Sequence, residues 1–211
     1  MTSIAAARVP DEGACKTEVS PLTQPIAADG TSARSLLLIA AGGVLSGVLT
    51  PLLPQLIDRI SGSPGLLRIA LVAVPFAVLV FVVVRRCSAN PGWAALLAGL
   101  ITMVAFVGAV NAAIWIDGQT YGAARMMRNI LAGLAGGFVG AGVMALGIAL
   151  LPAGPRNTVA WLQMLLTGTL AGALMALDNA LGLDLASVLY PVWQAAVAVR
   201  LATVLRRTKF G

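Results

Sequence analysis

Six long apolar segments occupy most of this chain and limit what it can fold into. They cover residues 35–57, 66–84, 93–116, 127–151, 158–181 and 185–205. A helix needs about 20 apolar residues to cross a hydrocarbon layer roughly 30 Å thick, and its backbone hydrogen bonds are then satisfied internally. The sequence therefore predicts an all-α membrane protein, a bundle of six transmembrane helices.

The composition supports a membrane environment. Hydrophobic residues make up 59% of the chain and charged residues 10%, whereas about a quarter of the residues in soluble domains are charged. The net charge of +6 comes from Lys and Arg near the ends of the apolar segments, where such residues contact lipid headgroups. We therefore expect the lipid bilayer as a partner, and no nucleic acid.

Three regions follow from this pattern. Residues 1–33 mix small, polar and charged residues without periodicity, which predicts a disordered tail. Residues 34–206 form the predicted transmembrane domain, and residues 207–211 are a short basic C-terminus. The abundance of Ala, Gly and Arg is typical of bacterial proteins from GC-rich genomes, so we expect a multipass protein of the bacterial plasma (inner) membrane.

The orientation is predicted from the basic residues. An even number of helices places both ends of the chain on the same side. That side carries Arg34, Arg85, Arg86, Arg156, Arg206, Arg207 and Lys209, and the other side carries Arg59, Arg68, Arg125 and Arg128. Because basic loops are retained in the cytoplasm, both termini are expected there.

Prolines predict irregularities in two helices. Pro51 and Pro54 lie near the end of the first segment, and Pro75 lies within the second. Proline lacks a backbone N–H and clashes with the preceding turn, so it kinks or ends a helix. We expect such breaks at these positions.

Small residues four positions apart predict close helix packing, because they let helix backbones approach each other. The pairs are Gly43 with Gly47, Gly133 with Gly137, Gly136 with Gly140, and Gly168 with Gly172. The fourth segment is the richest in glycine and is the expected central helix. Packing within one chain is the simplest interpretation, while a homo-oligomer interface or a pore lining remains open.

Few polar residues interrupt the apolar segments: Gln55, Asn111, Gln163, Asp178, Asn179, Gln194 and Arg200. Because polar groups are costly in hydrocarbon, each should face protein or water. Five of them are candidate transport or structural sites, namely Asp178, Asn179, Asn111, Gln163 and Arg200. Asp178 could relay protons, bind a cation, or pair with Arg125 or Arg128 at the same end, whereas Arg200 should extend to headgroups.

Aromatic residues lie near the predicted helix ends, where an amphipathic ring bridges hydrocarbon and headgroups. They are Trp93, Trp115, Tyr121, Trp161, Tyr190 and Trp193. We expect interfacial anchors at these positions. For Trp193, which precedes Gln194, stacking on a substrate is the alternative.

The sequence predicts no catalytic residues, metal site or cofactor. Histidine is absent, and the two cysteines are far apart in sequence, which argues against the common metal and nucleophile motifs. Asp117-Gly118 with Ala124-Arg125 resembles part of the motif of the CDP-alcohol phosphotransferases. The interval between the two pairs is wider here and no acid follows before Asp178, so the resemblance assigns no residue.

Three functional classes remain after these features are considered. The preferred interpretation is a non-catalytic membrane component or complex subunit, whose glycine-lined faces contact a membrane partner or a second copy. The alternative is a small-solute transporter or channel, with polar residues lining the route. An enzyme acting on lipid is the weakest, because its acid, base or metal groups are missing.

Overall fold

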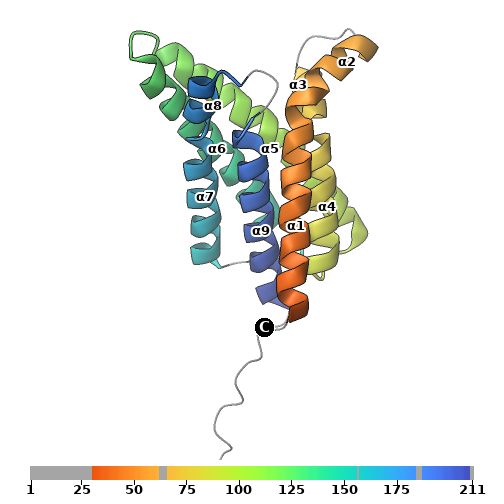
Figure 1. Cartoon of the computed structure of the whole chain (residues 1–211). Coiled ribbons are helices and arrows are strands. Elements are labelled where there is room, and N and C mark those ends of the chain that lie inside the picture. The colour runs from red at the N-terminus through yellow and green to blue at the C-terminus, as the bar shows by residue number, and fades with distance from the viewer. Residues whose placement is uncertain (1–29, 62–65, 156, 184–186, 210–211) are drawn as a thin grey trace, which may run out of the picture.

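The structure is a computed structural model that describes residues 30–61, 66–155, 157–183 and 187–209. Within these ranges all the regular elements are helices, as Figure 1 shows. In chain order they are α1 (Gly30–Leu49), the 3-10 helix η1 (Thr50–Leu52), α2 (Leu53–Ser61), α3 (Leu66–Val72), α4 (Val74–Cys87), α5 (Gly92–Gln119), α6 (Arg125–Ala149), α7 (Thr158–Gly172), α8 (Met175–Leu181) and α9 (Leu189–Lys209).

Four helical segments in the described residues are long and apolar enough to cross a membrane. They are Ala33–Ile57, Gly92–Gln119, Arg125–Ala149 and Thr158–Ala180. An all-helical chain compatible with a membrane environment is therefore confirmed. The count of six transmembrane helices stays a prediction. The second predicted segment is divided into the shorter helices α3 and α4, and α9, which corresponds to the last predicted segment, is not among these four.

The prolines interrupt the helices as predicted. At Pro51, α1 gives way to η1 and then to α2. At Pro75, α3 ends and α4 begins, with Ala73 between them. A further break, between α7 and α8 at Ala173 and Leu174, has no proline and was not predicted.

The first and last helices pack against each other. Besides the contacts between chain neighbours, α9 packs against α1, α4 and α7, and Figure 1 shows it between α7 and α1. Arg206 donates a hydrogen bond to Ser35 at 2.5 Å, so both ends of the described chain lie at one end of the bundle. We call this the terminal end. The opposite end, where α5 is followed by α6, is the distal end.

The predicted tail overlaps the start of α1, and the predicted central helix corresponds to α6. Residues 1–29 of the tail lie outside the described residues, while residues 30–33 belong to the first turn of α1. α6 has the largest buried share of the four membrane-compatible segments. It packs against α5, α7 and α8, so it shares the interior of the bundle with α9.

Large buried side chains are concentrated toward the terminal end. Phe76, Met144, Ile148, Met164 and Leu201 are fully buried and belong to one hydrophobic cluster. Met144, Ile148, Met164 and Leu201 come from the terminal halves of α6, α7 and α9, and Phe76 lies near the start of α4, against Trp193. Since bulky side chains fill this half of the bundle, the distal half is where space remains between the helices.

A buried polar network joins α1 to α9. Ser46 donates a hydrogen bond to the Gln194 side-chain oxygen at 2.5 Å, and the Gln194 amide donates to Thr50 Oγ1 at 2.9 Å. All three side chains are buried. Ser46 is also bonded to the Gly43 carbonyl and Thr50 to the Ser46 carbonyl, so both hydroxyls keep a partner without Gln194.

We expect Gln194→Leu to lower the free energy of unfolding by about 1 kcal/mol, since hydrogen bonds between membrane helices are worth roughly 0.6 to 1.7 kcal/mol. Thermal unfolding in detergent, followed by circular dichroism, measures the change. Gln163→Leu is the matched control, because Gln163 is exposed, and it should leave the midpoint unchanged. Equal midpoints for the two variants would show that the network does not stabilise the α1–α9 contact.

Candidate functional site

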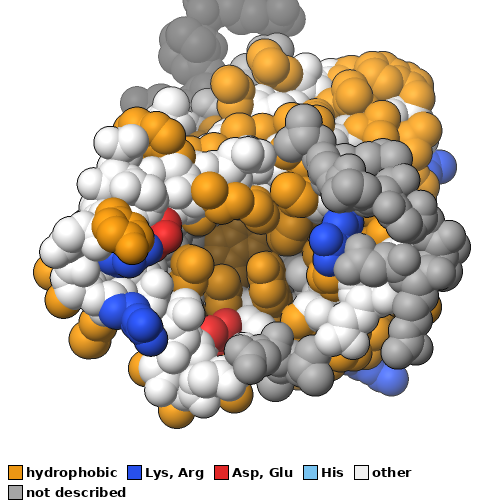
Figure 2. Space-filling view, turned by 90° about the horizontal axis from the view of Figure 1, so that it is seen from above, with side chains coloured by type: hydrophobic (Ala, Val, Ile, Leu, Met, Phe, Trp, Pro, Cys, Tyr) orange, Lys and Arg blue, Asp and Glu red, His pale blue; other side chains and the backbone are white. Residues whose placement is uncertain are grey.

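The distal end of the bundle contains a cavity of about 520 Å³. Figure 2 looks into it from above, where hydrophobic side chains surround a hollow and both acidic and basic groups lie near its margin. Its wall comes from α5, α6, α8 and the first turns of α9, and Pro51 of η1 completes it. Ala109, Ala113 and Gly136 line it, and their small side chains leave the space open.

Trp193 separates the cavity from the hydrophobic core. Its ring lines the cavity and also packs against the core cluster. The indole N–H donates a hydrogen bond to the Gly168 carbonyl of α7 at 3.0 Å. Phe76 of α4 meets the indole edge to face, with ring centroids 5.6 Å apart. The cavity is therefore open at the distal end and closed by Trp193 toward the terminal end.

Asp178 lies in the cavity wall and caps α9. Its carboxylate accepts hydrogen bonds from the Ser187 hydroxyl at 2.5 Å and from the backbone N–H groups of Val188 and Leu189 at 2.8 and 3.3 Å. These amides belong to the start of α9, where the helix dipole favours a negative charge. Asp178 therefore connects α8 to α9.

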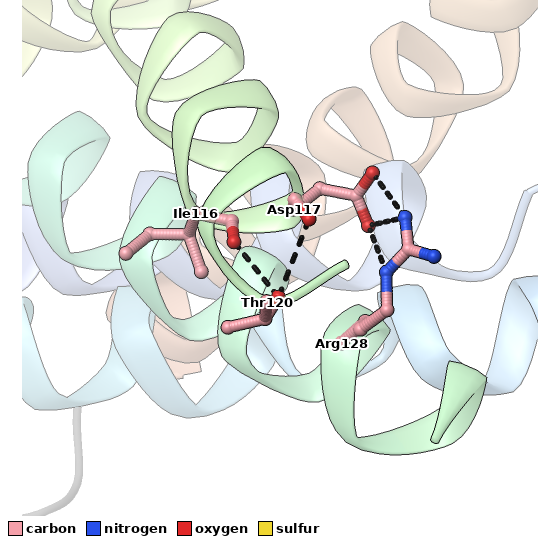
Figure 3. A network of polar contacts seen from close by, with 4 residues as sticks. All are labelled: Ile116, Asp117, Thr120 and Arg128. Atoms are coloured by element: carbon pink, nitrogen blue, oxygen red, sulfur yellow. Dashed lines mark hydrogen bonds and ion pairs between the residues drawn. The ribbon is translucent and has the colours of Figure 1, made fainter. Parts of the chain in front are cut away.

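The suggestion that Arg128 pairs with Asp178 is wrong. Arg128 pairs instead with Asp117 across the α5–α6 connection, through three hydrogen bonds of 2.7 to 3.0 Å (Figure 3). The guanidinium also lies 5.1 Å from the centroid of the Tyr121 ring. Because Arg128 is only three residues from the α6 start, the two helix ends are close enough for this pair to form, and it leaves Asp178 without that partner.

Two polar groups of the cavity wall have hydrogen-bonding capacity to spare. In the described part of the chain, the Tyr190 hydroxyl has no hydrogen-bond partner, and its ring lies 6.2 Å from that of Phe106. Asn179 uses its amide N–H on the Met175 carbonyl, which leaves its side-chain oxygen available. Both groups could bind a solute.

Only two of the five polar candidates line the cavity, namely Asp178 and Asn179. Asn111 is exposed, and its amide donates to the Val107 carbonyl of its own helix at 2.8 Å. Gln163 and Arg200 are exposed on α7 and α9. The structure therefore does not assemble these five side chains into one route.

The eight glycines at four-residue spacing lie where helices approach each other. A Cβ on Gly133 would collide with the Gly172 carbonyl, and one on Gly137 with the Gly168 carbonyl. The remaining contacts are Gly43 with Ala195, Gly47 with Pro191, and both Gly136 and Gly140 with Ala109. These positions face α9 from α1, and α5 and α7 from α6.

The expectation of interfacial anchors does not describe two of the aromatic residues, although stacking on a substrate was the alternative for Trp193. Trp93, Trp115 and Tyr121 are exposed, as anchors would be, but Tyr190 and Trp193 line the cavity. The signal in the sequence was the buried Gln194 next to Trp193, since a polar residue within an apolar helix should face protein. Trp193 points about 100° away from Gln194 on the helix, so this signal places one face of α9 against protein without fixing the direction of the ring, and stacking on a substrate stays a prediction.

Comparison with known proteins found no similar protein. No protein-family model, no curated protein and no solved structure matches this chain. The function is therefore argued from the geometry of the site.

Proposed function

We propose that this chain is a multipass membrane transporter that binds a small, weakly polar solute in the distal cavity. One observation carries the proposal: the cavity is open at one end and closed at the other by Trp193. Small-molecule sites are mostly apolar clefts of roughly 300–1,000 Å³ with a few polar groups, and this cavity has that size and character. A transporter gives access to such a site from one side at a time.

The proposed location is the bacterial plasma membrane, with six spans and both termini in the cytoplasm. Arg85 and Arg86 at the end of α4, together with Arg206, lie toward the terminal end, and basic residues favour the cytoplasmic side. In this orientation the cavity opens outside the cell. A catalytic role is not part of the proposal, since the chain has no histidine and no catalytic motif.

The second candidate is a non-catalytic subunit of a membrane complex, or a homo-oligomer. Asn111 and Gln163 favour it, because both are exposed amides on helices whose outer surface is mostly apolar. An amide in lipid is costly, and a partner helix would satisfy it. In this case the cavity would have no transport role.

Cysteine labelling in proteoliposomes tests the proposal in a chain whose Cys15 and Cys87 are replaced by serine. Ala113 lines the cavity, whereas Ala105, on the same helix, is buried in the core. A membrane-impermeant maleimide on the distal side should label the Ala113→Cys variant. A transporter should in addition allow labelling of the Ala105→Cys variant from the terminal side, as the cavity closes and reopens.

The outcomes separate the two candidates. Labelling at position 113 alone favours the non-catalytic subunit, because access never changes sides. No labelling at position 113 contradicts the solute-binding cavity itself. Val104→Cys is the control, since Val104 is exposed on the outer surface of α5, where lipid keeps the water-soluble maleimide away.

A further inference from the structure

We propose that the solute taken up by the cavity is a small organic cation with a mainly apolar body; this rests on the proposed function. The charges of the wall point to a cation. The whole chain has 14 Lys and Arg against 8 Asp and Glu. Among the described residues that line the cavity, in contrast, there are two carboxylates, Asp117 and Asp178, and no Lys or Arg.

The two carboxylates differ in how far their charge is compensated. Asp117 forms an ion pair with Arg128 at 2.7 Å, so the pair is neutral. The partners of Asp178 are a hydroxyl and backbone amides, which stabilise the negative charge without cancelling it. The start of a helix contributes only about half a positive charge. Asp178 therefore gives the cavity a net negative charge.

The remaining wall suits an organic cation better than a metal ion. Phe106, Tyr190 and Trp193 all line the cavity, and aromatic faces attract cations through their quadrupole. The Tyr190 hydroxyl can accept a hydrogen bond from an ammonium group. A calcium ion, by comparison, takes 6–8 oxygen ligands, and most of this wall is apolar. An apolar body would fill the space between these polar groups.

Two isosteric probes test the inference, phenyltrimethylammonium and its neutral analogue tert-butylbenzene. Calorimetric titration of the full chain in lipid nanodiscs, corrected with protein-free nanodiscs, measures each affinity. We expect the cation to bind at least about tenfold more tightly than the neutral analogue. Asp178→Asn should weaken the affinity for the cation about tenfold, equal to about 1.4 kcal/mol. The affinity for the neutral analogue should change less than about twofold.

Asparagine at position 178 keeps an oxygen for capping α9, and asparagine is a good helix cap, so the variant is expected to fold. Thermal unfolding checks this. Phe106→Leu is the second variant. It removes an aromatic face from the wall, and it should lower the affinity for the cation more than the affinity for the neutral analogue. It keeps the test available if Asp178→Asn fails to fold.

Ala113→Trp separates the failure of this inference from the failure of the proposed function. A bulky ring at Ala113 fills part of the cavity and should abolish binding of both probes. If both probes bind with equal affinity, and Ala113→Trp is the only variant that lowers the affinity of either probe, the cavity is a solute site but not a cation site. If neither probe binds, or if Ala113→Trp leaves binding unchanged, the solute-binding cavity is contradicted as well.

Discussion

Gly133→Ala is expected to lower the free energy of unfolding by about 3 kcal/mol, the upper part of the usual range for overpacking. A Cβ on Gly133 would collide with the Gly172 carbonyl of α7. The obstacle is backbone, which cannot turn aside as a side chain can, so α6 and α7 must separate. The thermal midpoint in detergent should fall by roughly 6–12 °C for a chain of this size.

Gly142→Ala is the matched control for this prediction, because Gly142 lies on the same helix. A Cβ there would meet only the Leu165 side chain, at an ordinary contact distance of 3.6 Å. Alanine favours a helix over glycine by about 1 kcal/mol, so this variant should be as stable as the parent or more stable. If both variants shift the midpoint equally, the α6–α7 contact is not the cause.

The same contact has a consequence for the cavity. Gly133 and Gly137 line the cavity and also face α7, so the separation of α6 from α7 would change the shape of the wall. Loss of probe binding in Gly133→Ala at a temperature where the chain is still folded would reveal this coupling. Gly142 does not line the cavity, and its variant should bind normally.

Features that depend on one residue and its neighbours could be predicted from the sequence. The breaks at Pro51 and Pro75 follow from a missing N–H, whatever the proline packs against. The apolar segments likewise follow from local composition. The break between α7 and α8 could not be predicted in this way, because no proline lies near Ala173 and Leu174, and Gly172, which ends α7, is one of many glycines in these helices.

Features that depend on distant residues could not be predicted from the pattern. The contact between α1 and α9 joins Ser46 to Gln194, which are 148 residues apart. The partners of Asp178 are amides at the start of the next helix, beyond the reach of helical spacing. Arg128 was free to pair with either Asp117 or Asp178, and only the folded chain shows that Asp117 is the nearer.

The cavity is the part of the site that sequence reasoning detects least. It arises where Ala109, Ala113 and Gly136 from two helices face each other, and each is unremarkable in a chain this rich in small residues. The rotation of α9 decides whether Trp193 points to lipid or to the interior. Position along the helix indicates the depth of a residue in the membrane, but rotation is set by packing against neighbouring helices.

Trp193→Ala is expected to lower the free energy of unfolding by about 3 kcal/mol, the lower end of the range for removing a large aromatic side chain from a core. Part of the indole faces the cavity, so not all of its surface is lost from packing. Trp193→Phe is the matched variant. It keeps a ring against Phe76 but loses the N–H bond to Gly168, worth about 1 kcal/mol, and the volume of the second ring, so its free energy of unfolding should fall less than that of Trp193→Ala.

The two variants should also differ in access to the core, because the indole closes the cavity. Without a ring at position 193, water should reach the core from the distal side, and maleimide should label the Ala105→Cys variant from that side. With phenylalanine in place, labelling should stay slow. If alanine and phenylalanine give the same labelling rate, the closure does not depend on this ring, and the one-sided access on which the transporter proposal rests must come from elsewhere in the bundle.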